Sequence, residues 1–223
     1  MNLNIEKTAD GSVTLYREDL DEHYHSVKGA LTESLHVYID MAWRKFAERQ
    51  RYSIRVFEVG FGTGLNAALT AKTALDEKIK TEYFAVELHP LPSELSSALL
   101  DRQLLEYAGE YRSVNSAQWN VAVDINPYFT LHKISADLLT MILPTEINVV
   151  YFDAFAPEKQ PEMWEEQIFQ KIHDAMAPGA ILTSYCAKGS IRRLLQNVGF
   201  ITERLPGPPG GKREILRATR NVS

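Results

Sequence analysis

A strand, a glycine-rich turn and the start of a helix can be read in Val56-Phe57-Glu58-Val59-Gly60-Phe61-Gly62-Thr63-Gly64-Leu65-Asn66. An apolar run from residue 54 enters the turn, and a helical pattern over residues 65–75 leaves it. Gly60 can make a sharp turn because it has no Cβ, and the glycines after it let a ligand approach the backbone. Free backbone N–H groups at the start of the helix can also donate hydrogen bonds to a ligand. The stretch predicts a ligand-binding turn, and a tight turn without a ligand is the alternative.

Strands and helices alternate along the chain after residue 50. The predicted strands are 54–59, 83–86, 129–134, 147–152, 180–185, 201–205 and 214–219. The predicted helices are 65–75, one in the stretch before residue 107, 163–176 and 191–198. Such alternation predicts a mostly parallel sheet with helices on both faces. The Pro- and Gly-rich segment 206–211 predicts that the last two strands pair antiparallel. We therefore predict an α/β, Rossmann-like fold with a seven-stranded sheet and an antiparallel C-terminal strand.

The glycine spacing separates this turn from a dinucleotide-binding fingerprint. That fingerprint reads G-x-G-x-x-G, whereas here the third glycine comes one residue early and Leu65 stands in its place. Glu58 precedes the first glycine by two residues, and this order resembles motif I of the class I methyltransferases. The resemblance implies that the methionine and ribose parts of S-adenosylmethionine bind here. The predicted cofactor-binding residues of the turn are Glu58, Gly60, Phe61, Gly62, Thr63, Gly64 and Asn66.

Three further acidic residues follow predicted strands. Glu87 ends the second strand and can accept hydrogen bonds from both ribose hydroxyls. Asp137 follows the third strand, where this fold usually faces the adenine amino group, although the residue could equally cap a helix. Asp153 follows the β-branched and aromatic run 147–152. Because open α/β sheets bind ligands at the carboxyl ends of their strands, we expect all three at the cofactor site.

The first fifty residues form a front segment. Residues 13–16 are a strand candidate, and apolar residues at steps of three and four predict a helix over residues 30–49. We expect residues 1–50 to be a small N-terminal extension packed on a catalytic domain of residues 51–223. His23 and His25 are expected at the surface, whereas Tyr24 is a candidate cover for the cofactor.

Composition excludes several classes of protein. The 223 residues are 45% hydrophobic and 24% charged, which suits one ordinary core and argues against disorder. The formal net charge of -5 means that any nucleic-acid-binding surface must be local. The single cysteine, Cys186, excludes an internal disulfide framework and a cysteine-rich metal site. Since no signal peptide or membrane-spanning run is found, we expect a cytoplasmic protein that uses no membrane and no metal.

Several motifs in a fixed order carry a resemblance to one family. Beyond the glycine turn they are Asp153-Ala154-Phe155-Ala156-Pro157, the segment 161–164, the stretch 192–200 and Lys212-Arg213-Glu214. The chain is similar over residues 23–219 to the methyltransferase domain of the bacterial MnmC family, in its stand-alone, MnmD-like form. The resemblance implies methylation of the 5-aminomethyl group of a (2-thio)uridine at the tRNA wobble position, which gives a 5-methylaminomethyl group.

The same resemblance implies the cofactor and the partners. S-adenosylmethionine would supply the methyl group, and tRNA would be the substrate. In fused members a flavin-dependent domain with oxidoreductase activity first removes a carboxymethyl group, and we expect no flavin domain in this chain. Separate enzymes that install the aminomethyl group would then be functional partners.

The residue best suited to catalysis is Asp153. An amine must be neutral to attack the methyl group, and a nearby carboxylate can accept a proton from the ammonium. Phe152 and Phe155 flank this carboxyl group, and burial of that kind raises its pKa. We predict Asp153 as the base, with Phe155 and Pro157 shaping the pocket that aligns the reactants.

The C-terminal part of the chain is basic. From residue 186 onward, eight Lys and Arg stand against two Glu, in a protein with a net charge of -5. This asymmetry is typical of a local phosphate-contacting face, although scattered solubilising residues are the alternative. The predicted RNA-binding residues are Lys188, Arg192, Arg193, Lys212 and Arg213.

Two other functions remain open. A polyamine-type transferase of the same fold would bind a similar cofactor at a similar turn, although the basic excess and the segment 161–164 argue against it. A non-catalytic RNA-binding relative is the second alternative, and the intact glycine turn with Glu58 and Asp153 argues against it. A methylation assay on tRNA against polyamines separates the first, and calorimetry with the cofactor separates the second.

Overall fold

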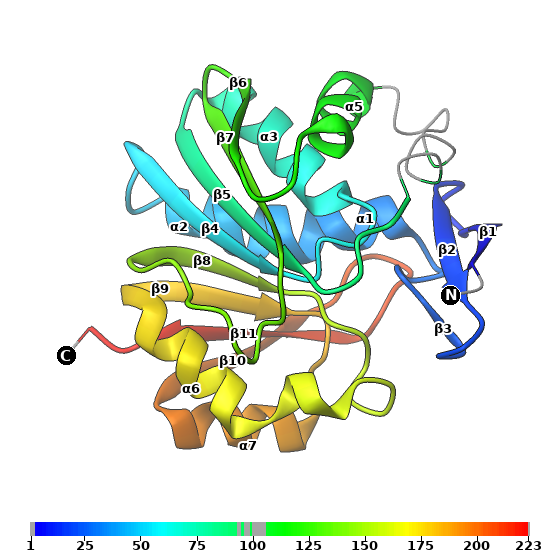
Figure 1. The fold of residues 1–223 in the computed structure, drawn as a ribbon. Helices are drawn as coiled ribbons and strands as arrows, with labels where there is room; N and C mark the ends of the chain where they lie inside the picture. Colours follow the sequence, from blue (N-terminus) through cyan, green and yellow to red (C-terminus); the bar gives the residue numbers. More distant parts are fainter. Residues whose placement is uncertain (1–2, 93–94, 96–98, 100–105, 223) are drawn as a thin grey trace.

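The described part of the chain forms one eight-stranded sheet with helices on both faces (Figure 1). The computed structural model describes residues 3–92, 95, 99 and 106–222. The order across the sheet is β10-β11-β9-β8-β4-β5-β7-β6. The strands are β4 (Ser53–Val59), β5 (Lys80–Glu87), β6 (Ala122–Asn126), β7 (Phe129–Ser135), β8 (Ile147–Phe152), β9 (Met176–Ser184), β10 (Phe200–Pro206) and β11 (Glu214–Arg220).

Strand directions confirm the mostly parallel sheet, with one strand more than the seven expected. The neighbours β7, β5, β4, β8 and β9 pair in parallel. β11 is antiparallel to both β9 and β10, as predicted for the C-terminal pair. The additional strand is β6, which pairs antiparallel with β7 at the edge. Its sequence is short and contains Asp and Asn, and none of its residues is fully buried, so the hydrophobic pattern does not reveal it.

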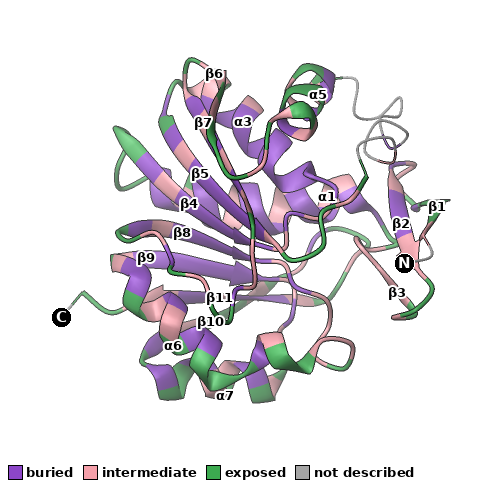
Figure 2. Ribbon diagram, viewed as in Figure 1, coloured by how far each residue is buried: buried purple, intermediate pink, exposed green. Residues whose placement is uncertain are grey.

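Two hydrophobic cores lie on the two faces of the sheet. Val56 of β4 belongs to one core, and the next residue, Phe57, belongs to the other. Because both faces are covered, the central strands are buried along most of their length (Figure 2). The first core lies under α3 (Leu65–Glu77), α5 (Ala108–Ser116) and the front helix, and the second under α6 (Glu166–Ala175) and α7 (Gly189–Val198).

The front segment combines a small sheet with a long helix that packs into the first core. Trp43 of this helix is fully buried, and its Nε1 donates a hydrogen bond to Thr81 Oγ1 at 3.2 Å. The helix predicted over residues 30–49 is therefore present, and its middle part is wound as a π-helix. Its consecutive parts are α1 (Ala30–Ser34), η1 (Leu35–Arg44) and α2 (Lys45–Ala47). The antiparallel strands before it are β1 (Leu3–Lys7), β2 (Val13–Arg17) and β3 (Glu22–His23).

One predicted helix differs from the expectation, and another is predicted in a stretch that lies largely outside the described residues. The helix expected over residues 163–176 starts as the 3-10 turn η3 (Pro161–Trp164) and restarts as α6, because Glu165 has an extended backbone with φ of -84° and ψ of 154°. It ends at Ala175, since Met176 already begins β9. The other helix is predicted somewhere in the stretch up to Tyr107, of which residues 93–94, 96–98 and 100–105 lie outside the described residues.

Cys186 is buried just after β9, with its sulfur free of a disulfide. Burial raises the pKa of this thiol. Within residues 3–92, 95, 99 and 106–222 there is no group of three or more His, Cys, Asp or Glu that could hold a metal ion. The same residues include no helix with the length and apolar character needed to cross a membrane.

Candidate active site

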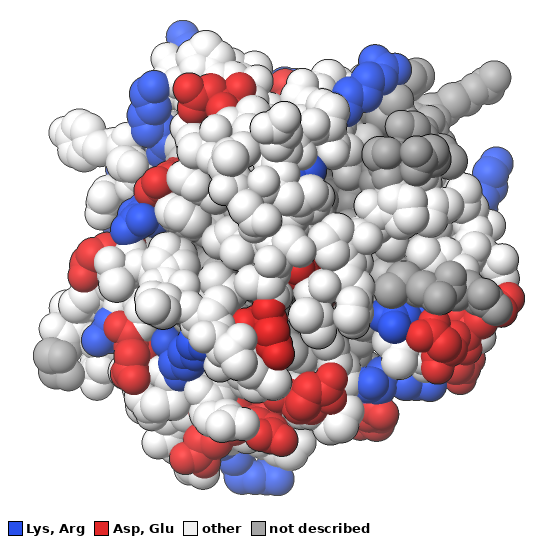
Figure 3. Space-filling model, viewed as in Figure 1, with Lys and Arg blue, Asp and Glu red and all other residues white. Residues whose placement is uncertain are grey.

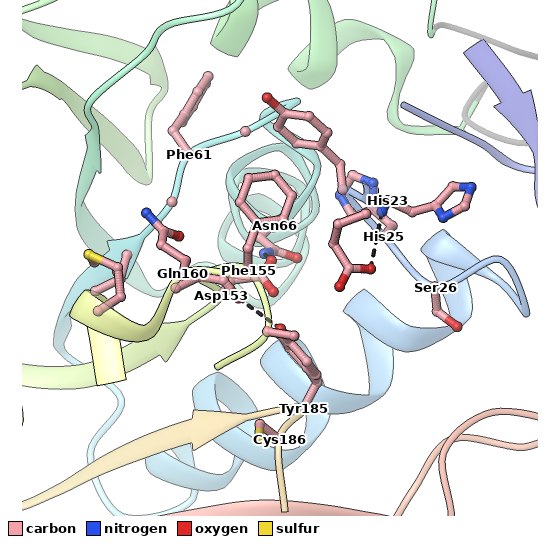
Figure 4. Close-up of a pocket in the computed structure, with 18 of the residues that line it drawn as sticks. His23, His25, Ser26, Phe61, Asn66, Asp153, Phe155, Gln160, Tyr185 and Cys186 are labelled. Atoms are coloured by element: carbon pink, nitrogen blue, oxygen red, sulfur yellow. Dashed lines mark hydrogen bonds between the residues drawn. The ribbon is translucent and has the colours of Figure 1, made fainter. Parts of the chain in front are cut away.

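A cavity of about 730 Å³ opens at the carboxyl ends of the central strands. Ligands bind at this edge in open α/β sheets. Its wall combines the glycine turn, the segment after β8, the front segment and the loop between β10 and β11. Figure 4 shows Asp153, Asn66 and Phe155 together in the middle, with His25 on one side and Tyr185 below. Segments far apart in the sequence therefore meet around one space.

The glycine turn has a backbone conformation that favours glycine at three positions. Gly60, Gly62 and Gly64 have φ angles of 86°, 50° and 78°. A Cβ on Gly60 would lie 2.9 Å from the backbone oxygen of Asp153, so the segment after β8 can pack this closely only against glycine. A Cβ on Gly62 would lie 3.2 Å from the ring of Tyr24. The turn is thus enclosed by two other parts of the wall.

The predicted cofactor-binding residues separate into two groups. Glu58 is fully buried within β4 and is linked to the cavity through Asn66, whose Nδ2 donates to its Oε1 at 3.0 Å. Thr63 and Gly64 lie at the start of α3, where the carbonyl of Thr63 accepts a hydrogen bond from Asn115 at 3.2 Å. These three residues are not part of the cavity wall, so any contribution to cofactor binding is indirect. The residues that line the cavity are Gly60, Phe61, Gly62, Asn66, Glu87, Asp137 and Asp153.

Glu87 and Asp137 present carboxylates on the wall, each already engaged with nearby backbone. Glu87 accepts hydrogen bonds from the N–H of Gly62 at 3.1 Å and of His89 at 2.9 Å. Burial raises the pKa of Glu87. Asp137 Oδ1 accepts the N–H of Leu139 at 2.8 Å. Asp137 therefore closes a local turn, no helix begins at this point of the described chain, and the residue also lines the cavity, so its contact with adenine stays a prediction.

Asp153 has both carboxylate oxygens hydrogen-bonded. Tyr38, from η1 of the front helix, donates its hydroxyl to Oδ1 at 2.6 Å. Asn66 donates Nδ2 to Oδ2 at 2.8 Å, and the same amide nitrogen bonds Glu58. Since each carboxylate oxygen has two lone pairs, Asp153 can still accept a hydrogen bond or a proton from a ligand. Figure 4 places this carboxylate in the middle of the cavity residues.

Burial raises the proton affinities of the two neighbouring carboxyl groups by different amounts. It raises the pKa of Asp153 to about 6, although the hydrogen bonds from Tyr38 and Asn66 oppose the rise. Burial raises the pKa of Glu58 well above its usual range, and repulsion by Asp153 adds to this rise. Burial therefore disfavours the charged form of both groups, and a pKa of about 6 leaves Asp153 mostly ionised at pH 7, so that it can act as a base.

An aromatic wall stands beside Asp153. The rings of Phe155 and Tyr24 meet edge to face, with centroids 5.1 Å apart. The guanidinium carbon of Arg17 lies over the same Phe155 ring, 5.8 Å from its centroid. Pro157 lines the cavity further along the segment. These side chains give the cavity flat apolar surfaces of the kind on which a planar base can stack.

Two polar aromatic residues hold the segment after β8 in place. The hydroxyl of Tyr185 donates to the carbonyl of Ala154 at 2.8 Å. The indole Nε1 of Trp164 donates to the carbonyl of Phe155 at 2.8 Å, and Trp164 is buried in the second core. Trp164 therefore stabilises the segment from behind, whereas Tyr185 lines the cavity.

The front segment supplies cavity residues that the sequence does not predict. The surface positions expected for His23 and His25 are wrong: both residues are half-buried and line the cavity, because the strand β3 and the residues after it fold over the glycine turn. Burial lowers the pKa of His25 to about 4. Its ring nitrogens lie 3.4 Å from the hydroxyls of Thr14 and Thr63. A run of three ring-bearing residues, 23–25, in a short connection is the signal that could have indicated this cover.

The predicted RNA-binding residues fall in two places. Arg192 and Arg193 lie on α7, away from the cavity wall. Lys188 forms an ion pair with Glu158, which partly neutralises it. On the face shown in Figure 3, acidic and basic side chains are interspersed. The residues brought to the cavity are Lys188, Lys212 and Arg213.

The chain is similar in sequence to known proteins of one name. The curated relatives include tRNA 5-methylaminomethyl-2-thiouridine biosynthesis bifunctional protein MnmC of Pseudomonas savastanoi, 33% identical over 90% of this chain and 32% of that protein. The protein of the same name from Leptospira interrogans is 28% identical over 94% of this chain and 34% of the relative. The chain thus spans about a third of the length of the curated relatives it matches. These similarities confirm the resemblance to the MnmC family.

Solved structures and a family model complete the comparison. The crystal structure of MNMC2 from Aquifex aeolicus matches with a TM-score of 0.81 and 26% identity, covering 100% of this chain and 71% of that one. Spermidine synthase from Thermotoga maritima matches with a TM-score of 0.64 and 14% identity, over 99% of this chain and 71% of that one, which shows the fold alone. The model of a family described as S-adenosyl-L-methionine-dependent methyltransferase matches residues 97–221. Because this match spans more than half of the chain, the protein belongs to that methyltransferase family.

Proposed function

We propose that this protein methylates the 5-aminomethyl group of a (2-thio)uridine at the wobble position of tRNA, giving 5-methylaminomethyl-(2-thio)uridine. The observation that carries the proposal is the carboxylate of Asp153, which two donors hold on the wall of a cavity beside the glycine turn. The names of the relatives, which concern tRNA 5-methylaminomethyl-2-thiouridine biosynthesis, supply the substrate class.

The residues on the wall fit S-adenosylmethionine. Asn66 Oδ1 is buried without a hydrogen-bond partner among the described residues, and Asn66 lines the cavity, so it can accept a hydrogen bond from an amino group of the ligand. Glu87 would accept from the ribose hydroxyls and Asp137 from the adenine amino group. When bound, S-adenosylmethionine supplies an electrophilic methyl group. Gly60, Phe61 and Gly62 would form its immediate support, with Glu58, Thr63 and Gly64 acting from behind.

Asp153 would act as the base. A primary amine is mostly protonated near neutral pH and then has no lone pair for the attack. The carboxylate of Asp153 can accept that proton, and its pKa of about 6 makes it a stronger base than an ordinary Asp while it is still ionised at pH 7. Tyr38 and Asn66 fix its orientation. Phe155 and Pro157 would shape the space for the uridine ring.

The tRNA backbone would approach over the basic rim of the cavity. Lys188, Lys212 and Arg213 are part of this rim, so their charges can contact phosphates while the modified base enters. Arg192 and Arg193 on α7 would extend the contact. A tRNA substrate places the reaction in the cytoplasm, and the enzymes that install the aminomethyl group become its functional partners.

A competition between substrates tests the proposal. Protein with labelled S-adenosylmethionine is incubated either with tRNA that carries the unmethylated aminomethyl group or with polyamines. Label transferred to tRNA supports the proposal, and label transferred only to polyamines contradicts it. If calorimetry detects cofactor binding but neither substrate gains label, the chain is a non-catalytic relative.

A further inference from the structure

Glu33 is a buried carboxylate on the cavity wall that the proposed mechanism does not use. It lies in α1, its residue is 9% exposed, and it lines the cavity. Its Oε2 accepts the backbone N–H of Ser26 at 3.2 Å, which ties the cover of the cavity to the front helix. Its Oε1 has no hydrogen-bond partner within the described residues. A carboxylate oxygen that is buried but not hydrogen-bonded is suited to bind a hydrogen-bond donor or a cationic group of a ligand.

The ammonium of Lys212 lies next to this oxygen. Lys212 Nζ is 3.6 Å from Glu33 Oε1, beyond hydrogen-bond distance but close enough for an ion pair. The same Nζ is 3.6 Å from the centroid of the Tyr185 ring, so it sits on the face of that ring. An aromatic face beside a carboxylate is an environment that attracts an ammonium group.

The position of this environment relates it to catalysis. The hydroxyl of Tyr185 bonds the carbonyl of Ala154, the residue directly after Asp153. The charges of Glu33 and Lys212 also act on Asp153, where Glu33 raises and Lys212 lowers the pKa of its carboxyl group. The three charged groups therefore share one part of the cavity.

Lys212 is held there only weakly. Its side chain is 43% exposed, and it lies in the connection between β10 and β11. Partly exposed ion pairs and cation–π contacts contribute little free energy, because solvent screens them and the long side chain loses conformational freedom. A second cation can therefore displace it at small cost.

We propose that Glu33 Oε1 and the face of Tyr185 form the subsite that receives the primary ammonium of the substrate before it reaches Asp153, and that Lys212 is an internal cation competing for this subsite. The inference rests on the proposed function, because that function requires a cationic aminomethyl group. The subsite would select a protonated amine over a neutral substituent of the same size. A displaced Lys212 would be free to turn toward a phosphate of the tRNA.

Because Lys212 competes with the substrate ammonium in this proposal, removing its charge should tighten binding of the amine. The probe is the nucleoside 5-aminomethyluridine, which has the ammonium and no phosphate, and binding is measured by calorimetry with S-adenosylhomocysteine present. Lys212→Met should tighten binding of this nucleoside by roughly two- to five-fold, the size expected for removing one partly exposed charge interaction. Lys45→Met is the control, since it removes a different and more exposed Lys–Glu pair, with Glu48 at 2.6 Å, outside the cavity.

Three further measurements complete the test. Glu33→Gln retains an acceptor for Ser26 but loses the charge, so binding of 5-aminomethyluridine should weaken while binding of S-adenosylhomocysteine stays unchanged. The neutral analogue 5-hydroxymethyluridine should bind all variants equally. For tRNA, Lys212→Met should instead raise the KM, because the variant has no ammonium group to offer a phosphate.

Several results would overturn the inference. They are unchanged or weaker nucleoside binding by Lys212→Met, no effect of Glu33→Gln, equal changes for the neutral analogue, or no binding of the amine by any variant. Methylation of tRNA by the wild-type protein is scored separately. If the wild type methylates tRNA while the nucleoside results fail, the subsite is wrong and the proposed function stands.

Discussion

Asp153 is the proposed base, and its replacement gives the sharpest single-residue prediction. Asp153→Asn retains the size of the side chain and its hydrogen-bonding capacity but removes the charge. We expect kcat to fall by roughly 10²–10⁴-fold, the usual size of a general-base contribution. Activity should partly recover at higher pH, where more of the amine is neutral. Binding of S-adenosylmethionine should be retained, since the glycine turn and Glu87 are untouched. An unchanged rate at pH 7 would make Asp153 a structural anchor.

The pH dependence of the wild type follows from the same group. Burial raises the pKa of Asp153 to about 6, so the carboxylate gains its proton as the pH falls through that value. The rate should therefore show a break at about pH 6, and Asp153→Asn should lack this break because its rate follows only the neutral fraction of the amine. A limb near pH 4, where an ordinary Asp titrates, would contradict the burial effect. The measurement is kcat/KM across a pH series with folding checked by circular dichroism.

Gly62 tests the glycine turn at the same scale. Its φ of 50° disfavours a branched side chain, and a Cβ would lie 3.2 Å from Tyr24. Gly62→Val should therefore abolish binding of S-adenosylmethionine in calorimetry while the fold persists. Gly109→Val is a suitable control, because a Cβ at Gly109 would meet no atom within 4 Å. Normal cofactor binding by a folded Gly62→Val protein would place the cofactor elsewhere.

Some of these residues can be predicted from sequence and others cannot, for a physical reason. Gly60, Asn66 and Asp153 stand in short contiguous motifs, since a turn and a strand end are local structures. Tyr38 reaches Asp153 across 115 positions of sequence, and no spacing rule relates the two. Glu33 is equally remote from its neighbour Lys212. Contacts of this kind depend on how the front helix packs, which a single sequence does not specify.

At the scale of elements, the front helix is an internal part of the core. Trp43 is fully buried and hydrogen-bonded to Thr81 of β5. Trp43→Ala should lower the free energy of unfolding by about 3–5 kcal/mol, as is usual for a large aromatic residue cut back in a core. Urea denaturation measures this. Tyr52→Ala is the control, because Tyr52 is 89% exposed, and its effect should stay within about 0.5 kcal/mol. A small decrease for Trp43→Ala would mean that residues 1–50 are a detachable extension.

The rim and α7 can be tested as separate elements for tRNA binding. Reversing Lys188 and Arg213 on the rim to Glu should weaken tRNA binding and lower the salt slope by about 0.7–0.9 for each phosphate that is no longer neutralised. Reversing Arg192 and Arg193 on α7 should have a smaller effect, because they lie away from the cavity. Binding curves over a salt series measure both pairs, and cofactor affinity is the control. If both variants keep the salt slope of the wild type, the excess of basic residues is only a solvated surface.

Element prediction succeeds where burial gives a strong pattern and fails where it does not. The central strands β4 and β8 are buried over most of their length, and β8 is apolar except for Asn148, so its run of hydrophobic residues is distinctive. The edge strand β6 is partly exposed along its length, and β1 is mostly exposed, so neither has such a pattern. The hydrogen bonding of η1 is also invisible in sequence, because apolar steps of three and four are shared by α- and π-helical winding.

At the scale of the whole molecule, charge and cavity have separate roles. The protein is acidic overall, with a net charge of -5, and acidic and basic side chains alternate on the face in Figure 3. The proposed attraction of tRNA would therefore depend on a few cations at the cavity rim and not on the total charge. The two cores fix the sheet, and the cavity lies where the strand ends, the front segment and the late loop meet. The proposed function requires these three parts of the chain to meet at one cavity.

The central claim is methyl transfer to an aminomethyl group of tRNA. The most direct test is nucleoside mass spectrometry of tRNA bearing 5-aminomethyl-(2-thio)uridine after incubation with the protein and S-adenosylmethionine. We predict that this nucleoside is converted to its 5-methylaminomethyl form, with a mass gain of one CH₂ at the exocyclic amine, and that the conversion is abolished without cofactor and strongly reduced in Asp153→Asn. An unchanged nucleoside profile, or a methyl group at any other position of the tRNA, would contradict the claim.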